Sequence, residues 1–297
     1  MRKFNDILEN AKQCEKKNLV VPQPRSKRVF TAINEAKKAG FITPVLVDTE
    51  DISRENLSSL GIDHTGYEFV EIENPSSALA EAMQILHRNE ADMIFQGDLN
   101  GKYFLDTIAE NDGGIVQMNA LSYVSLFELP TENKMILLTD TFIQEFPDLK
   151  QKIRILTNAL SLTDILGIEK PNVAALTMLE RVNIAVPSTT DAAVLAKMSE
   201  RGQFNATVDG PLDIDCASSP EKAQRKGIKS PVSGKVDIYL LPDIESGYCI
   251  AEVMTYLGRA PSAGILLGSD IPIILNLKFE PTESLVLNIA LALLRTP

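Results

Sequence analysis

Short apolar runs that favour β-strands alternate along this chain with amphipathic segments that favour helices. Residues 18–21 form such a run, residues 28–40 are expected to form a helix that ends at Gly40, and residues 43–47 form the next strand. The same alternation continues as far as residues 263–267. Strands separated by helices of this kind pair in parallel and are covered by helices on both faces. The sequence therefore predicts an α/β fold with largely parallel sheets.

The length of the chain favours two domains. With 297 residues, of which 44% are hydrophobic, it can form one large core or two moderate ones. A long helical pattern begins at Asp148, and we place the domain boundary just before it. The apolar helix expected over residues 285–294 returns to the first domain. We therefore expect a first α/β domain from residues 1–146 and 267–297, and a second from residues 147–266.

Composition narrows the classes of partner and compartment. A formal net charge of −11 argues against a broad surface for nucleic acid or an anionic membrane, because both require clustered Lys and Arg. Cys14, Cys216 and Cys249 are widely spaced and odd in number, which favours a reducing compartment such as the cytoplasm. No run of 18 apolar residues and no apolar signal core occur. We expect a soluble cytoplasmic protein without a nucleic-acid or membrane partner.

Several common catalytic motifs are missing from the sequence. His64 and His87 are the only histidines, and neither belongs to a metal-binding HExxH or HxH pattern. A GxSxG nucleophile turn, a GxGxxG dinucleotide loop and a Walker loop are also absent. These absences argue against a metal site, a Ser-His-Asp hydrolase and a Rossmann-type nucleotide site, and no tightly bound cofactor is expected.

Polar turn residues follow five of the expected apolar strands. In an α/β sheet the carboxyl ends of the strands are where ligands bind, although any single one of these runs is more often an ordinary turn. If the two sheets face one another, the five ends converge on one interdomain cleft suited to an elongated, phosphate-bearing ligand. The five runs are residues 96–98, 139–140, 209–211, 242–244 and 268–270. Among them Asp209-Gly210-Pro211 is expected to make a sharp turn.

Blocks spread over nearly the whole chain resemble the phosphate acetyl/butyryltransferase family, which exchanges an acyl group between coenzyme A (CoA) and phosphate. They are LTDTFIQEFPDLKQKIRILTNA from Leu138, NIAVPSTTDAAVLAKM from Asn183, TVDGPLDIDCASS from Thr207, VDIYLLPDIESGYCI from Val236, and the tail AGILLGSDIPIIL with PTESLVLNIALAL. The resemblance implies a two-domain fold like that of isocitrate and isopropylmalate dehydrogenases, with the active site in the interdomain cleft. It also implies a homodimer built mainly from the second domain, which holds CoA or acyl-CoA as a substrate, with acyl phosphate as the other small molecule.

Residues 276–284 depart from the family pattern. Family members carry a run such as TSRxDSxES, in which the serine and arginine serve the reaction and a later polar residue assists. Here Leu277 stands for the serine and Lys278 for the arginine. Leucine cannot donate a hydrogen bond to developing negative charge, and lysine lacks the bidentate fork that matches phosphate. Lys278 and Ser284 are therefore the candidates for what remains of the catalytic groups.

A second departure lies at residues 114–123, where family members carry several arginines and a histidine. This run contains no basic residue, and Val116, Asn119 and Ala120 occupy the positions of the arginines. A doubly charged phosphate is difficult to desolvate without cations or many amides. Compensating charge could come from other turns. The basic residues considered for that role are Lys102, Lys134 and Arg181.

The candidates for ligand binding lie in the five polar runs and in the blocks that resemble the family. They are Ser188, Thr189, Asp209, Gly210, Pro211, Asp243, Gly247 and Gly268. Ser188 and Thr189 could equally cap a helix that begins near Asp191. The leading hypothesis is an acyltransferase of this family with altered phosphate-handling residues. The second hypothesis is a non-catalytic CoA- or acyl-CoA-binding or regulatory protein, and the third is a dehydrogenase of the same fold.

Overall fold

The chain divides at residues 121/122 and 261/262 in the computed structural model, which describes residues 1–109, 114–129 and 132–296. The N-terminal unit comprises residues 4–121 and 262–297, and the central unit comprises residues 1–3 and 122–261. The sequence places these boundaries later, at 146/147 and 266/267. The difference arises because strand β6 (Lys134–Thr139) pairs in parallel with β9 (Ile238–Leu240) and so belongs to the central unit.

The N-terminal unit contains a sheet with the strand order β3-β2-β1-β4-β11-β10. Its pairs are parallel except for the antiparallel pair of β10 and β11. The strands are β1 (Lys17–Pro22), β2 (Ile42–Asp48), β3 (Glu68–Glu71), β4 (Met93–Phe95), β10 (Ser262–Leu267) and β11 (Ile273–Ile274). Because β1, β2 and β4 are parallel, their carboxyl ends lie at the same end of the sheet.

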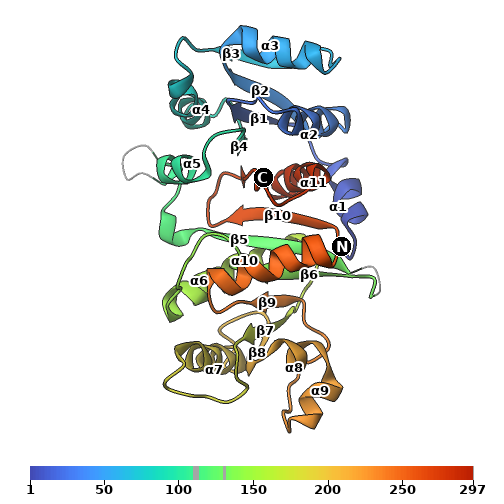
Figure 1. Ribbon diagram of the computed structural model, residues 1–297, viewed down its shortest axis with the longest axis vertical. Coiled ribbons are helices and arrows are strands. Elements are labelled where there is room, and N and C mark those ends of the chain that lie inside the picture. Colours follow the sequence, from blue (N-terminus) through green and yellow to red (C-terminus); the bar gives the residue numbers. More distant parts are fainter. Residues whose placement is uncertain (110–113, 130–131, 297) are drawn as a thin grey trace. The chain divides into compact units, whose positions relative to one another are not determined.

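Helices lie on both sides of these strands, with α1, α2 and α11 grouped together and α4 and α5 grouped on the other side (Figure 1). Ser26 begins α2 by accepting a hydrogen bond from the Val29 amide, and Gly40 follows its end with a φ of +82°. The helix expected over residues 28–40 is thus confirmed. The helices are α1 (Phe4–Ala11), α2 (Lys27–Lys38), α3 (Glu50–Ser59), α4 (Ala78–His87), α5 (Gly101–Ile108) and α11 (Thr282–Arg295), with 3₁₀ turns at Pro75–Ser77 and Met118–Ala120.

The central unit has the strand order β5-β6-β9-β7-β8. β5 and β6 form an antiparallel pair, and the remaining pairs are parallel. Besides β6 and β9, the strands are β5 (Ser122–Leu129), β7 (Asn172–Leu176) and β8 (Thr207–Leu212). The helices are α6 (Leu149–Ile165), α7 (Pro187–Glu200), α8 (Ile214–Ser218), α9 (Pro220–Arg225) and α10 (Ile244–Glu252), and α10 continues into a π-helical turn at Val253–Leu257.

Asp209, Gly210 and Pro211 form part of strand β8, so the sharp turn expected there is wrong. β8 pairs with β7 alone among the described strands of this unit, and an edge strand tolerates proline because the missing N–H has no ladder partner to lose. A Cβ at Gly210 would lie 2.8 Å from the Ala175 carbonyl oxygen, so glycine is required by the close approach of β7.

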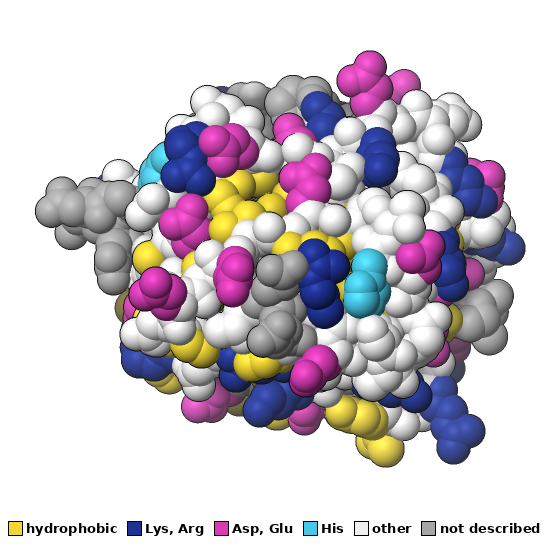
Figure 2. Space-filling view, turned by 90° about the horizontal axis from the view of Figure 1, so that it is seen from above, with side chains coloured by type: hydrophobic (Ala, Val, Ile, Leu, Met, Phe, Trp, Pro, Cys, Tyr) yellow, Lys and Arg dark blue, Asp and Glu magenta, His cyan; other side chains and the backbone are white. Residues whose placement is uncertain are grey.

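The surface seen from the α3 end of Figure 1 carries Lys and Arg interspersed with Asp and Glu, and its histidine side chains lie apart (Figure 2). Within the described ranges, the helices are all too short or too polar to cross a bilayer.

Candidate functional site

A large cavity of the central unit lies where β7 and β9 end and four helices begin. We call it the helix-start pocket. It has a volume of about 900 Å³. Its wall consists of residues 146–149, 152, 176–178, 186–188, 191, 213–214, 241–243, 246 and 250. The carboxyl ends of parallel strands and the amino ends of helices therefore meet at one site, which is the expected position of a ligand in an α/β fold.

Three of the four helices are capped by aspartates on this wall. Asp148 accepts a hydrogen bond from the Gln151 amide at 2.8 Å and forms a capping box at α6. Asp243 accepts from the Ser246 amide at 2.8 Å at the start of α10, and Asp213 accepts from the Cys216 amide at 3.1 Å at the start of α8. The wall is therefore acidic, and these carboxylates are already bound to backbone amides.

The fourth helix, α7, begins at Pro187 without a side-chain cap. The Asp191 carboxylate in its first turn pairs with the Lys152 ammonium of α6 at 2.8 Å. Both side chains are largely buried, with 7% of Lys152 and 19% of Asp191 exposed. Lys152 is the single basic side chain on the described wall of the helix-start pocket. Nothing in the sequence distinguishes Lys152 from Lys150 of the same helix, so it could not be predicted.

Two of the eight predicted binding residues, Ser188 and Asp243, line the helix-start pocket. Thr189 does not, because it is fully buried and its hydroxyl accepts from the Asn183 amide and donates to the carbonyls of Asn183 and Val186. Because a hydroxyl has a single proton, the two carbonyls share that one donor, and the hydroxyl holds the segment that precedes α7 in place. Ser188 follows Pro187, and its side chain makes no capping hydrogen bond at the start of α7.

The other predicted residues of the central unit serve packing. The Asp209 carboxylate accepts a hydrogen bond from the adjacent Gly210 amide at 2.9 Å, and neither these residues nor Pro211 line the described pocket walls. Gly247 is buried in α10, where a Cβ would lie 2.5 Å from the Asp140 carbonyl oxygen. Gly247 thereby allows α10 to approach the end of β6.

Asp140, in the predicted polar strand end after β6, is nearly fully buried. Its carboxylate accepts hydrogen bonds from the amides of Tyr123, Phe142, Ile143 and Gln144 at 2.9–3.1 Å. Burial raises the pKa of Asp140 from 3.8 to about 6, because the loss of solvent outweighs these amides. Asp140 therefore organises the turn before α6 and makes no contact with the helix-start pocket.

The three predicted residues of the N-terminal unit differ in exposure. Gly268 follows β10 with a φ of +102°, which favours glycine, and Lys278 is exposed. Ser284 is buried at 1% exposure, and its hydroxyl donates to the Ser262 carbonyl and contacts the Ser262 hydroxyl at 3.1 Å. The structure therefore leaves Lys278 accessible to a ligand and sequesters Ser284.

Residues 276–284, the reaction segment of the family pattern, are held firmly in the N-terminal unit. The Arg28 guanidinium of α2 donates to the carbonyls of Leu277 and Glu280 at 2.9 and 2.7 Å. Leu277 itself is only 4% exposed. Leu277, which the family resemblance places at the serine position, is thus a core side chain.

Asn276 is a polar residue of the reaction segment that the sequence analysis did not single out. Its amide nitrogen atom Nδ2 donates to the Gly97 carbonyl at 2.8 Å, while its backbone N–H donates to Gln96. Its side-chain oxygen Oδ1 is buried and has no hydrogen-bond partner among the residues that the structure describes. A Cβ at Gly97 would lie 2.0 Å from the Pro22 carbonyl oxygen, so this strand end also depends on glycine.

The basic residues considered as substitutes for the missing arginines are partly engaged. Lys102 pairs with Asp106 at 2.9 Å, and Lys134 pairs with Asp237 at 3.2 Å. Arg181 is exposed in the segment between β7 and α7. In the run at 114–123, Val116 is half-buried and Asn119 is exposed.

A cluster of three carboxylates, from Glu180, Asp213 and Asp215, surrounds the Lys226 ammonium. The sulfur of Cys216 lies within the same group, and burial, with Asp213 nearby, raises the pKa of that thiol to about 12. Although these residue types can bind metals, Lys226 already supplies the cation. The cluster joins the start of α8 to the segment before α7, which together form part of the rim of the helix-start pocket.

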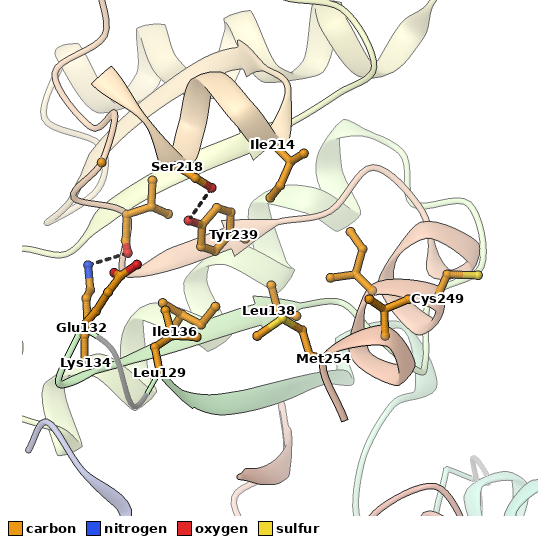
Figure 3. A pocket seen from close by; sticks show the side chains of 14 residues that line it. Leu129, Glu132, Lys134, Ile136, Leu138, Ile214, Ser218, Tyr239, Cys249 and Met254 are labelled. Carbon is orange, nitrogen blue, oxygen red and sulfur yellow. Dashed lines mark hydrogen bonds between the residues drawn. The ribbon is translucent and has the colours of Figure 1, made fainter. Parts of the chain in front are cut away.

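A second cavity of the central unit, of about 460 Å³, lies between β6, β9, α8 and α10, and we call it the sheet-face pocket. Figure 3 shows Ile136, Leu138 and Met254 near one another along its length, with the hydrogen bond between Ser218 and Tyr239 on the opposite side. Ile214 and Ile250 line both this pocket and the helix-start pocket. The sheet-face pocket is mainly apolar, with Glu132 and Lys134 at one end (Figure 3).

Comparison with known proteins gives a consistent result. The family model described as "Phosphate acetyl/butaryl transferase" matches residues 76–292. The chain is 35% identical to a phosphate butyryltransferase of Clostridium acetobutylicum, over 99% of this chain and 98% of that protein. It is 31% identical to a phosphate acetyltransferase of Rhizobium meliloti, over 98% of this chain and 93% of that protein.

A solved structure supports the fold. The crystal structure of a branched-chain phosphotransacylase from Enterococcus faecalis V583 matches with a TM-score of 0.80 at 24% identity, covering 94% of this chain and 98% of that one. This match confirms the α/β fold class expected from the family resemblance.

Proposed function

The chain belongs to the phosphate acetyl/butyryl transferase family, and from this premise we propose that it transfers an acyl group between CoA and phosphate. CoA or acyl-CoA is then a substrate rather than a tightly bound cofactor, and acyl phosphate is the second substrate. The single observation that carries the proposal is the helix-start pocket. Its volume and its position at strand and helix ends suit part of a CoA molecule.

In the proposed reaction the CoA thiolate attacks the carbonyl carbon of an acyl phosphate. A carbon–sulfur bond forms, the bond from that carbon to the phosphate oxygen breaks, and inorganic phosphate leaves with the electron pair. No covalent bond to the protein is needed, so orientation and charge stabilisation supply the rate. Lys278 is the exposed cation of the reaction segment that can stabilise the departing phosphate.

The phosphate-handling groups are altered in this chain. Leu277 is buried and has no donor, and Ser284 directs its hydroxyl to Ser262. Residues 114–123 contain no basic side chain. Loss of one preorganised donor to a developing oxyanion typically lowers the rate about 100- to 1,000-fold. We therefore expect slow exchange with phosphate and intact binding of CoA.

A second candidate function is favoured by the same observations on the reaction segment. Because both its serine position and Ser284 are unavailable, the chain could bind CoA or an acyl-CoA without turnover. That function, sensing or regulation by a CoA ester, requires the helix-start pocket and not Lys278.

Two measurements on the same preparation separate these functions. Calorimetric titration with CoA, acetyl-CoA and butyryl-CoA measures binding, and an acyl-phosphate exchange assay over several acyl-chain lengths measures turnover. Binding with slow exchange supports the altered transferase. Binding without exchange at any chain length contradicts the enzyme and supports the binding protein, and absence of both contradicts the two functions together.

We also propose a homodimer that forms through the central unit. Large apolar side chains are exposed beside the sheet-face pocket, at Ile214, Val253, Tyr256 and Leu257, with exposed fractions of 52–80%. A neighbouring cluster of this kind fits a self-complementary two-fold interface. Leu257→Glu should convert the dimer to a monomer in analytical ultracentrifugation, whereas an unchanged sedimentation coefficient would contradict this location. The three free cysteines are consistent with the proposed cytoplasmic location.

A further inference from the structure

Lys152 lines the helix-start pocket, and its ammonium has N–H donors that the described residues do not use. A lysine ammonium has three N–H donors. Among the described residues, it makes one hydrogen bond, to Asp191 at 2.8 Å. Its side chain is only 7% exposed, so water cannot surround the remaining donors freely. A buried charged donor without an acceptor is unfavourable, and a ligand in the pocket can supply that acceptor.

The charge of the pocket wall decides which acceptor fits. Lys152 is opposed by the carboxylates of Asp148, Asp191, Asp213 and Asp243, so one positive and four negative charges give a formal sum of −3 for the described wall. Asp213 is also paired with Lys226, outside the wall. A phosphate or diphosphate placed among these carboxylates is repelled, whereas an uncharged acceptor is not.

The rest of the wall is suited to an uncharged chain. Phe146 and Met178 are exposed apolar side chains at its edge, with exposed fractions of 74% and 77%. Leu149, Leu241 and Ile250 add further apolar lining. The Ser188 hydroxyl lies on the same wall as Lys152, and in the described part of the chain it makes no hydrogen bond. The pocket thus combines apolar surface with two kinds of donor.

We infer that the helix-start pocket holds the uncharged pantetheine arm of CoA, whose amide carbonyls accept hydrogen bonds from Lys152 and Ser188. The phosphates of CoA then lie outside this pocket, away from its four carboxylates. This inference rests on the proposed binding of CoA and specifies which part of the ligand the central unit recognises. Asp191 acts as a positioning residue that holds the Lys152 ammonium at the wall.

The test compares CoA with pantetheine, which shares the arm and lacks every phosphate. Removal of Lys152 alone would leave Asp191 as an unpaired buried charge, so the double variant Lys152→Met/Asp191→Asn is used. Calorimetric titration of wild type and variant, under reducing conditions and at low and high salt, gives the affinities. Loss of hydrogen bonds from a charged donor should weaken binding of both ligands about 10- to 100-fold, by the same factor and independently of salt.

A matched control is Lys197→Met/Glu200→Gln, which removes an exposed ion pair at the far end of α7 and makes the same changes of charge. It should leave both affinities unchanged. Ser188→Ala, at a half-buried position, provides a second variant that does not disturb an ion pair, and it should weaken both ligands about fivefold.

The outcomes separate this inference from the function on which it rests. Wild type that fails to bind CoA contradicts the proposed function. Wild type that binds CoA but not pantetheine overturns the inference alone. An effect of the double variant that is confined to CoA and disappears at high salt also overturns it, because Lys152 would then recognise phosphate. Unchanged affinities in both the double variant and Ser188→Ala overturn it as well.

Discussion

The helix-start pocket of the central unit has polar side chains on a cavity wall, whereas the serine of the reaction segment in the N-terminal unit is buried. In the pocket, Lys152 and Ser188 present donors to a cavity of about 900 Å³. In the reaction segment, Ser284 is bound to Ser262 and Leu277 is part of the core. The two regions therefore differ in the accessibility of their polar groups, and the proposed function, with intact CoA binding and slow exchange, rests on that difference.

The largest expected effect tests whether Leu277 is structural. Leu277→Ser replaces a side chain that is 4% exposed with a small polar one. By analogy with Leu→Ala changes in cores, the free energy of unfolding should fall by about 2–5 kcal/mol. Exchange activity should not rise, because the new hydroxyl would lie in the core. Denaturant unfolding and the exchange assay check both points.

Lys278→Arg, at the adjacent exposed position, is the control for Leu277→Ser and should leave stability unchanged. A stable Leu277→Ser variant with increased exchange would contradict the structural role of Leu277, since it would mean that position 277 faces the substrate.

A pH dependence tests the turn that supports the central unit. Because the pKa of Asp140 is about 6 in the folded protein and 3.8 in the unfolded chain, the folded form binds the proton more tightly. The resulting contribution to the free energy of unfolding is about 3 kcal/mol. It is complete below about pH 4 and is lost as the pH rises to about 6. Denaturant unfolding of wild type and Asp140→Asn measures it.

The free energy of unfolding of wild type relative to Asp140→Asn should be greater at pH 5 than at pH 7.5, by about 1 kcal/mol. A relative stability that increases with pH would contradict the assignment, because it would indicate a carboxylate stabilised in its ionised form.

A smaller effect is expected for the contact between α10 and the end of β6. In Gly247→Ala the added methyl group would lie 2.5 Å from the Asp140 carbonyl oxygen. Overpacking of this kind typically lowers stability by about 1–3 kcal/mol. The displaced start of α10 should also weaken CoA binding, because Asp243 lines the helix-start pocket. Thermal unfolding and calorimetry measure the two effects.

Gly101→Ala provides the matched control in the N-terminal unit, since its nearest contact would be an ordinary 3.6 Å from Gln96. Its stability should stay within about 0.5 kcal/mol of wild type. Equal effects of the two substitutions would argue against close packing at Gly247.

The smallest effect distinguishes Ser284 from Lys278. Ser284→Ala removes a buried hydrogen bond to Ser262 and should lower the free energy of unfolding by about 1 kcal/mol without changing the rate of exchange. Lys278→Ala should lower the rate of exchange without changing the free energy of unfolding, since its side chain is exposed and carries the charge. If Ser284→Ala instead lowered the rate at an unchanged KM, Ser284 would be a catalytic residue.

The sequence predicts the elements whose signals are local. The α6 helix follows Asp148, where the helical pattern of the sequence begins, and Asp148 forms a capping box with Gln151. The helices α8 and α10 are not predicted from the sequence, because Asp213 and Asp243 are residue types common both in turns and at helix caps. For Asp209-Gly210-Pro211, turn chemistry predicts a turn, and the position of β8 at a sheet edge allows a strand instead.

Of the candidate site, the sequence predicts Asp243 through its place after an apolar strand, and Ser188 through the block from Asn183 that resembles the family. Lys152 is not predictable in this way, because its burial and its partner Asp191 are products of packing between two helices. The buried state of Ser284 and Leu277 is likewise a tertiary property, which the family pattern alone does not reveal. The predicted interdomain cleft stays a prediction.

The most direct measurement of the central claim compares binding and turnover in the wild-type protein. CoA affinity by calorimetry and acyl-phosphate exchange should be measured beside the phosphate butyryltransferase of Clostridium acetobutylicum. We expect similar affinities for CoA and an exchange rate about 100-fold or more below that of the relative. Equal exchange rates would contradict the account, because the altered reaction segment would then handle phosphate as well as that of its relative.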